Sequence, residues 1–128
     1  MNIPVDLTSK DLDNFPVGEY SFACIGTEVV LNESGQMDAV VLKLSCQDPE
    51  FIGKPLNHRL STPQPGDTPE KVYMKKKTMK DTCAYFRIPF TAEGFNHEEF
   101  IGKTCRAFVK PVTSKKDGRI FDNVARWL

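Results

Sequence analysis

The chain of 128 residues has no CxxC pair and only two histidines, so it lacks the usual ligand set of a zinc site. Its four cysteines, Cys24, Cys46, Cys83 and Cys105, lie far apart in the sequence. Cys24, Cys46 and Cys105 fall at apolar positions of strand-like runs. We therefore expect buried free thiols, which suits the reducing cytoplasm.

Membrane-spanning and catalytic patterns are also lacking. No stretch approaches the roughly 20 consecutive apolar residues that cross a bilayer, which predicts a cytoplasmic protein without a membrane partner. No glycine-rich phosphate loop, HExxH or GxSxG sequence occurs. The positions of Asp38, Asp48, Asp117 and Asp122 fit turns and strand ends better than a nuclease metal site. We expect neither enzymatic activity nor a cofactor.

The formal net charge is zero, because 17 Lys and Arg residues balance 17 Asp and Glu residues. The layout of these charges is nevertheless uneven. Residues 1–50 contain two basic and nine acidic residues, whereas residues 51–128 contain fifteen basic and eight acidic residues. An asymmetry of this kind is typical of a chain that contacts a polyanion with one part of its surface.

The first 16 residues are acidic and interrupted by Asp, Asn and Pro, so we expect a flexible N-terminal arm at residues 1–16. Within it, Leu7, Leu12 and Phe15 are candidates to dock on the body of the protein. Residues 17–128 are expected to form a single domain of ordinary size.

Period-two alternation of apolar residues predicts five strands, at residues 19–31, 37–46, 54–61, 104–112 and 120–128. The alternation in the first strand changes phase near Ile25 and Gly26, which indicates a bulge or a bend. Between the third and fourth strands, Thr68 is a candidate N-cap and Pro69 a first helical residue. The helix is expected to run to about Arg87.

One stripe of this helix is apolar and the rest is rich in lysine. The residues that recur at helical spacing, and are expected to pack inward, are Val72, Met79, Cys83 and Phe86. The lysines on the other faces fit either a solvated surface or an electrostatic track for a polyanion.

The order of three strands, a helix and two strands is that of an OB-fold, a mainly β, five-stranded barrel with a helix between strands three and four. Other small barrels and an α+β sandwich share the same pattern. The pair Asp117-Gly118 predicts a hairpin between the last two strands.

The fourth strand carries the first candidate binding residues. Alternation places Arg106, Phe108 and Lys110 on its outer face. An exposed aromatic ring between two cations suits the binding of a single nucleic-acid strand, because phosphates pair with the cations and bases stack on the ring. The alternative is that Phe108 packs beneath the helix or the arm.

The following hairpin carries Lys115, Lys116 and Arg119. In OB-folds the last hairpin loop borders the ligand groove, so these residues are candidate phosphate contacts. The alternative is a solvated turn that contacts nothing.

Three further candidates lie on other strands. Arg59 is an outward cation on the third strand, and Phe121 and Trp127 are candidate stacking residues on the fifth. Strict alternation would place Phe121, Asn123, Ala125 and Trp127 on one face of the fifth strand and Ile120, Val124 and Arg126 on the other. Which of these faces is buried stays open. His58 is expected to be a satisfied core or rim histidine.

Four short fragments resemble a known group of proteins. They are Phe15-Pro16-Val17-Gly18-Glu19-Tyr20, Phe51-Ile52-Gly53-Lys54-Pro55-Leu56, Phe100-Ile101-Gly102-Lys103 and Asp117-Gly118 with Asn123-Val124. In this order they resemble small phage-encoded OB-fold proteins, some of which are regarded as single-stranded DNA-binding proteins and many of which are of unknown function. The resemblance implies coating of single-stranded DNA during phage replication or recombination, with contacts to replication or recombination proteins.

The sequence therefore predicts a non-enzymatic OB-fold protein that binds single-stranded DNA with little sequence specificity. The alternative is a protein-interaction or assembly module whose basic half docks on an acidic partner. RNA in place of DNA stays open, because contacts to the 2′-hydroxyl leave no signature in a sequence. A homodimer formed through a strand edge is also expected.

Overall fold

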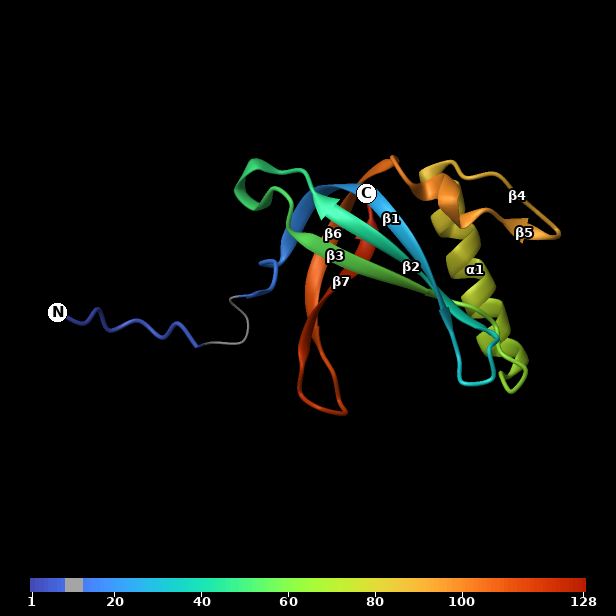
Figure 1. Ribbon diagram of the computed structural model, residues 1–128, viewed down its shortest axis with the longest axis horizontal. Helices are drawn as coiled ribbons and strands as arrows, with labels where there is room; N and C mark the ends of the chain where they lie inside the picture. Colours follow the sequence, from blue (N-terminus) through green and yellow to red (C-terminus); the bar gives the residue numbers. More distant parts are fainter. Residues whose placement is uncertain (9–12) are drawn as a thin grey trace.

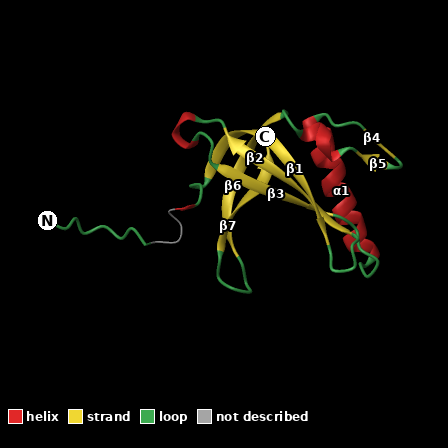
Figure 2. Cartoon of the chain, in the orientation of Figure 1, coloured by secondary structure: helices red, strands yellow, loops and turns green. Residues whose placement is uncertain are grey.

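Five antiparallel strands form one twisted sheet in the computed structural model of the chain, which describes residues 1–8 and 13–128 (Figures 1 and 2). The order in the sheet is β3-β2-β1-β6-β7. Their bounds are β1 Gly18–Leu31, β2 Met37–Cys46, β3 Pro55–Ser61, β6 Thr104–Thr113 and β7 Ile120–Trp127. The predicted mainly β class and the five predicted strands are confirmed.

The long strand β1 curls the sheet because its two halves pair with different neighbours. Gly18–Ala23 pairs with β6, and the strand from Phe22 onward pairs with β2. The register with β2 shifts between Cys24 and Gly26, where the sequence predicted a change of phase. An extra residue at such a point increases the local twist and bends the strand.

The sheet is not a closed barrel. β3 and β7 are its outer strands, and within the described residues no hydrogen-bonded ladder joins them. They meet through side chains instead, since the rings of His58 on β3 and Trp127 on β7 lie 5.0 Å apart between centroids. Barrel closure, which the sequence analysis expected, is therefore not found in this part of the chain.

Helix α1 (Pro69–Phe86) connects β3 to the second half of the sheet and begins where the sequence predicted. The Thr68 side chain accepts a hydrogen bond from the Lys71 backbone N–H at 3.2 Å, which satisfies one free donor of the first turn. The helix ends at Arg87, whose φ of 59° is left-handed. Only Thr82, Cys83 and Phe86 are buried, so the lysine-rich first half contributes little to the core.

Short elements fill the connections. They are the 3-10 turns η2 (Pro49–Phe51) and η3 (His97–Phe100) and a two-stranded hairpin of β4 (Phe90–Thr91) and β5 (Gly94–Phe95). The Asn96 side chain caps η3, since it accepts from the Glu98 backbone N–H at 3.0 Å. The β4–β5 hairpin was not predicted, because two residues per strand leave no alternation to detect.

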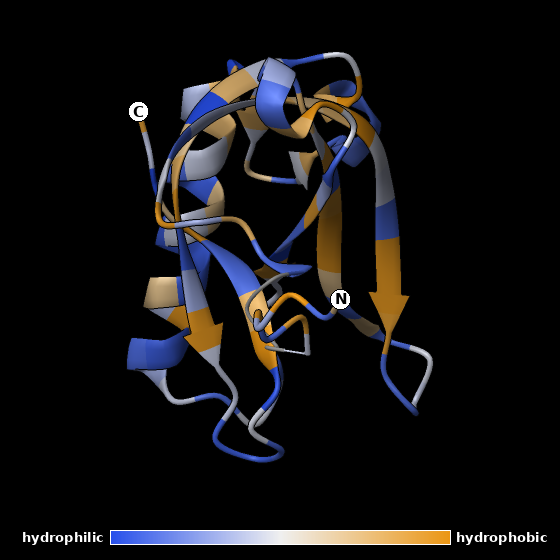
Figure 3. Cartoon of the chain, turned by 90° about the vertical axis from the view of Figure 1, so that its left-hand side faces the viewer, coloured by the Kyte–Doolittle hydropathy of each residue, from blue (hydrophilic) through white to orange (hydrophobic). Residues whose placement is uncertain are grey.

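The core lies on the concave side of the sheet. Its fully buried large side chains include Phe15, Phe22, Leu42, Leu44 and Phe100. Figure 3 shows hydrophobic segments along the strands and hydrophilic segments in the loops at their ends. All four cysteines are buried and free, as predicted for Cys24, Cys46 and Cys105, and burial raises the pKa of the Cys105 thiol to about 12.

The N-terminal segment divides into an exposed part and an anchored part. Residues 1–8 are exposed, and Leu7, which was a candidate to dock, is 78% exposed. Leu12 lies outside the described residues. Phe15 is only 1% exposed, and its backbone N–H donates to Asp122 Oδ1 at 2.9 Å. The chain is therefore tied to β7 just before β1 begins.

Candidate nucleic-acid interface

Strand β6 separates inward apolar residues from outward basic and aromatic ones. Cys105, Ala107 and Val109 are buried, as period-two alternation requires. Arg106 and Lys110 are exposed, and Phe108 between them is half-buried. The predicted outward placement of all three candidates on this strand is thus observed.

Strand β7 does not follow the strict alternation that the sequence analysis applied to it. Val109 pairs with Val124, but Phe108 pairs with Arg126, so one extra residue is inserted into β7 at this point. Because a bulge of this kind reverses the faces beyond it, Phe121 lies outward while Trp127 lies inward. The expected grouping of Phe121 with Trp127, and of Val124 with Arg126, is wrong for this reason.

The outward side chains of these two strands form what we call the β6–β7 face. Its residues are Arg106, Phe108, Lys110 and Val112 on β6, and Phe121, Asn123 and Arg126 on β7. Phe121 is 42% exposed and is the cross-strand partner of Val112, which is also exposed. The Val112–Phe121 pair lies two residues along the strands from the Lys110–Asn123 pair, so an uncovered aromatic ring stands near a basic side chain on the same face.

Arg126 is the basic residue of this face that the sequence analysis did not choose. Its guanidinium carbon lies 4.7 Å from the centroid of the Phe108 ring, a cation–π distance. The sequence could not have identified it without the register of β7. The only available signal was the presence of an arginine near the end of a strand opposite Phe108.

The β6–β7 hairpin extends the basic character beyond the strand ends. The Ser114 backbone N–H donates to Arg119 O at 2.8 Å, and Gly118 has a φ of 69°, as the Asp-Gly signal predicted. The Arg119 backbone N–H donates to the Asp117 carboxylate and lowers the pKa of that group. Lys115 and Lys116 are exposed, and within the described residues neither forms an ion pair.

The charge balance of the face and hairpin together is positive. Six basic side chains belong to it, namely Arg106, Lys110, Arg126, Lys115, Lys116 and Arg119. Two acidic side chains lie among them, Asp117 in the turn and Glu19 on β1. The Glu19 carboxylate lies 3.5 Å from Arg106. Both of these side chains are more than half exposed, so water and salt screen the pair and leave Arg106 free to exchange partners.

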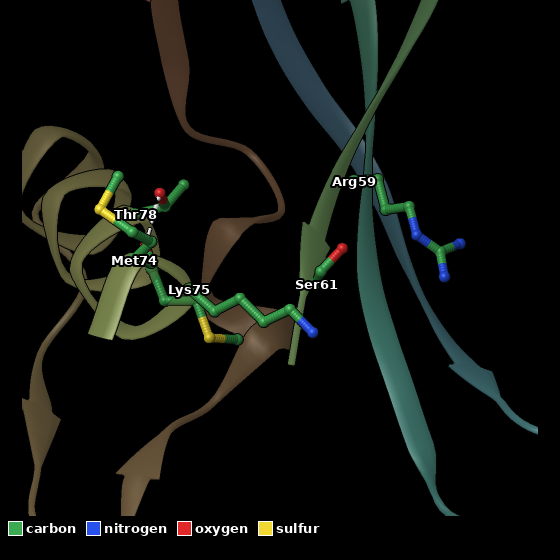
Figure 4. Close-up of a pocket in the computed structure, with 6 residues that line it drawn as sticks. Arg59, Ser61, Met74, Lys75 and Thr78 are labelled. Carbon is green, nitrogen blue, oxygen red and sulfur yellow. Dashed lines mark hydrogen bonds between the residues drawn. The ribbon is translucent and has the colours of Figure 1, made fainter. Parts of the chain in front are cut away.

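Arg59 is separated from the other candidates. It lies on β3, which is at the other end of the strand order from β7, and its guanidinium pairs with Asp38 on β2. Figure 4 shows the Arg59 side chain pointing away from α1, whereas Lys75 reaches from the helix toward Ser61. The hollow of about 230 Å³ at this place is lined by helix and strand residues. Arg59 is therefore held by Asp38, and within the described residues it has no hydrogen bond or ion pair with the β6–β7 face.

Trp127 is half-buried and packs against α1 and the core. Tyr85 is stacked on it with ring centroids 5.5 Å apart, and the Phe86 ring lies 5.1 Å away. The Tyr85 hydroxyl donates to Leu128 O at 2.7 Å, which ties the end of β7 to the helix. Trp127 is thus positioned to hold α1 against the sheet.

His58 faces the same aromatic cluster but lacks the hydrogen bond that was expected of it. Its Nε2 atom is buried, and within the described residues it has no hydrogen-bond partner. Burial disfavours the charged imidazolium and lowers the pKa of His58 to about 4. The expected hydrogen bond of His58 is thus not found within the described residues, and the ring lies at the rim of the core.

Comparisons with known proteins do not assign a family. No protein-family model matches the chain, and no curated protein matches it. In residues 1–8 and 13–128, no helix is both long and apolar enough to cross a membrane. The interpretation of the face therefore depends on its geometry and charge.

Proposed function

We propose that this chain is a non-enzymatic OB-fold protein that binds single-stranded DNA with little sequence specificity. The observation that carries the proposal is the β6–β7 face, where the exposed Phe121 and the half-buried Phe108 lie among basic side chains. Single-strand binders combine aromatic platforms with a basic track in this way. The order of strands and the helix between β3 and β6 support the OB-fold.

In this proposal the basic side chains hold phosphates and the two rings stack bases. Each stacked base contributes roughly 1–3 kcal/mol with little dependence on its identity. Phe121 is the open platform. Phe108 is covered on one side by Arg126, so a base that stacks there displaces the guanidinium, which then has a phosphate within reach. The lysines of the hairpin extend the track beyond the sheet.

The position of the loops supports the same groove. In an OB-fold, the loops between the first two and the last two strands border the ligand. Figure 1 shows the β1–β2 loop and the β6–β7 hairpin projecting from the same end of the sheet. The β1–β2 loop, residues 32–36, contains Glu33 and no basic residue, so phosphate contacts are assigned to the hairpin alone.

The proposal is tested by fluorescence anisotropy with a labelled oligo-dT of about 30 nucleotides, long enough for several stacking sites. If about four phosphates are neutralised, log K falls against log salt with a slope of about −3, given a slope of roughly −0.7 per contact. Phe121→Ala should weaken binding, and duplex DNA should not displace the oligonucleotide. A flat salt dependence, or binding that duplex removes, contradicts the proposal.

The alternative function is a protein-interaction or assembly module, and the zero net charge of the chain favours it. The same basic face would then dock on an acidic protein surface, with weak binding of oligo-dT even at low salt. Oligo-U at matched length separates RNA from DNA binding.

The proposed biological setting is phage DNA replication or recombination in the host cytoplasm, with a homodimer as the proposed assembly. The outer strands β3 and β7 each have one edge without a strand partner within the described residues, and such edges pair readily with a second copy. Sedimentation equilibrium measures the assembly directly.

A further inference from the structure

A groove of about 370 Å³ lies between α1 and the β4–β5 hairpin, away from the β6–β7 face. Figure 1 shows β4 and β5 beside α1, on the opposite side of the molecule from the β6–β7 hairpin. The volume is at the lower end of ligand pockets, which measure about 300–1,000 Å³. It has room for one or two side chains.

The floor and wall of the groove are apolar. Met79 and Cys83 come from α1, and Phe90 and Phe95 come from the hairpin. Cys83 is buried and Phe95 is half-buried, whereas Phe90 is 45% exposed. A large ring that stays this open on a short hairpin is a surface that an apolar partner group can cover.

The rim of the groove is basic. Lys76 and Lys80 are one helical turn apart on α1, on the side that faces the hairpin, and both line the groove. The Lys80 ammonium lies 6.0 Å from the Phe90 ring centroid. Within the described residues neither lysine forms an ion pair, while the one carboxylate of the hairpin tip, Glu93, accepts from Thr91 at 2.9 Å.

We propose that this groove binds an acidic peptide segment of a partner protein, with one apolar side chain over Phe90 and Phe95 and two carboxylates at Lys76 and Lys80. Charge complementarity at the rim and the apolar floor favour this occupant. The groove recognises this partner, while the β6–β7 face binds DNA, and the two binding events are independent.

A peptide fits this groove better than a nucleic-acid strand does. A base buried there would leave its hydrogen-bonding edges without partners, because thioether, thiol and phenyl groups line the floor. A Leu or Phe side chain has no polar edge to satisfy. Acidic residues that precede it in the peptide supply the carboxylates with which Lys76 and Lys80 can pair.

The test uses the full chain and a fluorescein-labelled peptide in which four aspartates precede Leu-Phe, with a capped C-terminus. We expect saturable, salt-sensitive anisotropy changes. Replacing Leu-Phe by Ala-Ala should abolish binding because the apolar floor loses its contact. Replacing the aspartates by asparagines should abolish it because the two lysines lose theirs. No binding of the acidic Leu-Phe peptide at low salt overturns the proposal.

Two variants locate the site, each with a matched control. Phe90→Ala should weaken peptide binding at least about fivefold, as for the loss of a central aromatic contact, whereas Phe121→Ala on the other face should not. Lys80→Glu should weaken it about tenfold by charge repulsion. Lys71→Glu makes the same change in the first turn of the helix, outside the groove, and should leave binding unaltered.

Competition separates this proposal from DNA binding. Saturating oligo-dT should leave peptide affinity unchanged, and Phe90→Ala should leave oligo-dT affinity unchanged. Displacement of the peptide by oligo-dT overturns the proposal, because the groove would then belong to a nucleic-acid path. Full peptide binding by both Phe90→Ala and Lys80→Glu overturns it as well, since the peptide would then occupy another surface.

Discussion

The guanidinium of Arg126 covers the ring of Phe108 across the β6–β7 pair, with 4.7 Å between the guanidinium carbon and the ring centroid. A contact of this kind at an exposed site contributes about 0.5–1 kcal/mol. It also keeps a cation beside a ring that is proposed to stack a base. The two residues therefore act as a pair in any binding measurement.

Arg126→Ala should reduce the salt slope of oligo-dT binding by about 0.7, because one phosphate contact is lost. The affinity at moderate salt should fall only modestly, since the exposed Phe108 ring becomes a better platform. Arg126→Lys should keep the slope, because it keeps the charge. Anisotropy titrations at several salt concentrations measure the affinity and the salt slope of each variant. An unchanged slope in Arg126→Ala would place Arg126 outside the interface.

The double substitution of Lys115→Ala and Lys116→Ala should reduce the salt slope by about 1.4, or roughly 0.7 for each lost contact. Thermal stability should stay nearly the same, because both side chains are exposed and unpaired within the described residues. Lys77→Ala on α1 is the control for a general loss of charge. Equal slopes in the double variant and the control would mean that the hairpin does not contact DNA.

Trp127→Ala should destabilise the fold by at least about 2 kcal/mol, since the indole packs against Tyr85, Phe86 and His58. Urea unfolding measures this, with Trp127→Phe as the milder variant. Because Trp127 is the only tryptophan, its emission reports on this cluster alone. Oligo-dT should change the emission little. Strong quenching would instead put the indole in contact with bases.

Stability should fall as the pH is lowered from about 6.5 to about 4. The folded protein holds His58 neutral down to a pKa of about 4, while the unfolded chain takes up a proton near pH 6.5, so the unfolded state binds more protons in this range. The full effect is as much as about 3 kcal/mol. His58→Leu should flatten this part of the profile in urea titrations. A profile that His58→Leu leaves unchanged would assign the effect to other groups.

Local features of the sequence predicted most of the elements. Alternation of apolar residues located the five strands to within one or two residues, and Thr68 and Pro69 marked the start of α1. The phase change at Gly26 indicated the irregularity in β1. These signals are readable because each depends on a few neighbouring residues and on backbone sterics or a nearby hydrogen bond.

The candidate site was predictable in part. The outward placement of Arg106, Phe108 and Lys110 follows from alternation in one regular strand. The place of Trp127 does not, because the bulge in β7 is set by pairing with β6 and reverses the faces beyond it. The pairing of Arg59 with Asp38 likewise depends on two strands that meet only in the fold.

The sequence by itself therefore determined the strands, the helix and its cap, the basic hairpin and the outward residues of β6, since period-two sterics and turn chemistry act over short distances. The tertiary structure alone decided which aromatic residues are open. Burial of Phe15, the inward packing of the half-buried Trp127, exposure of Phe90 and Phe121, and the lone buried nitrogen of His58 all result from contacts between distant segments. The packing of those segments, rather than local propensity, sets the accessibility of each ring and the pKa of the histidine.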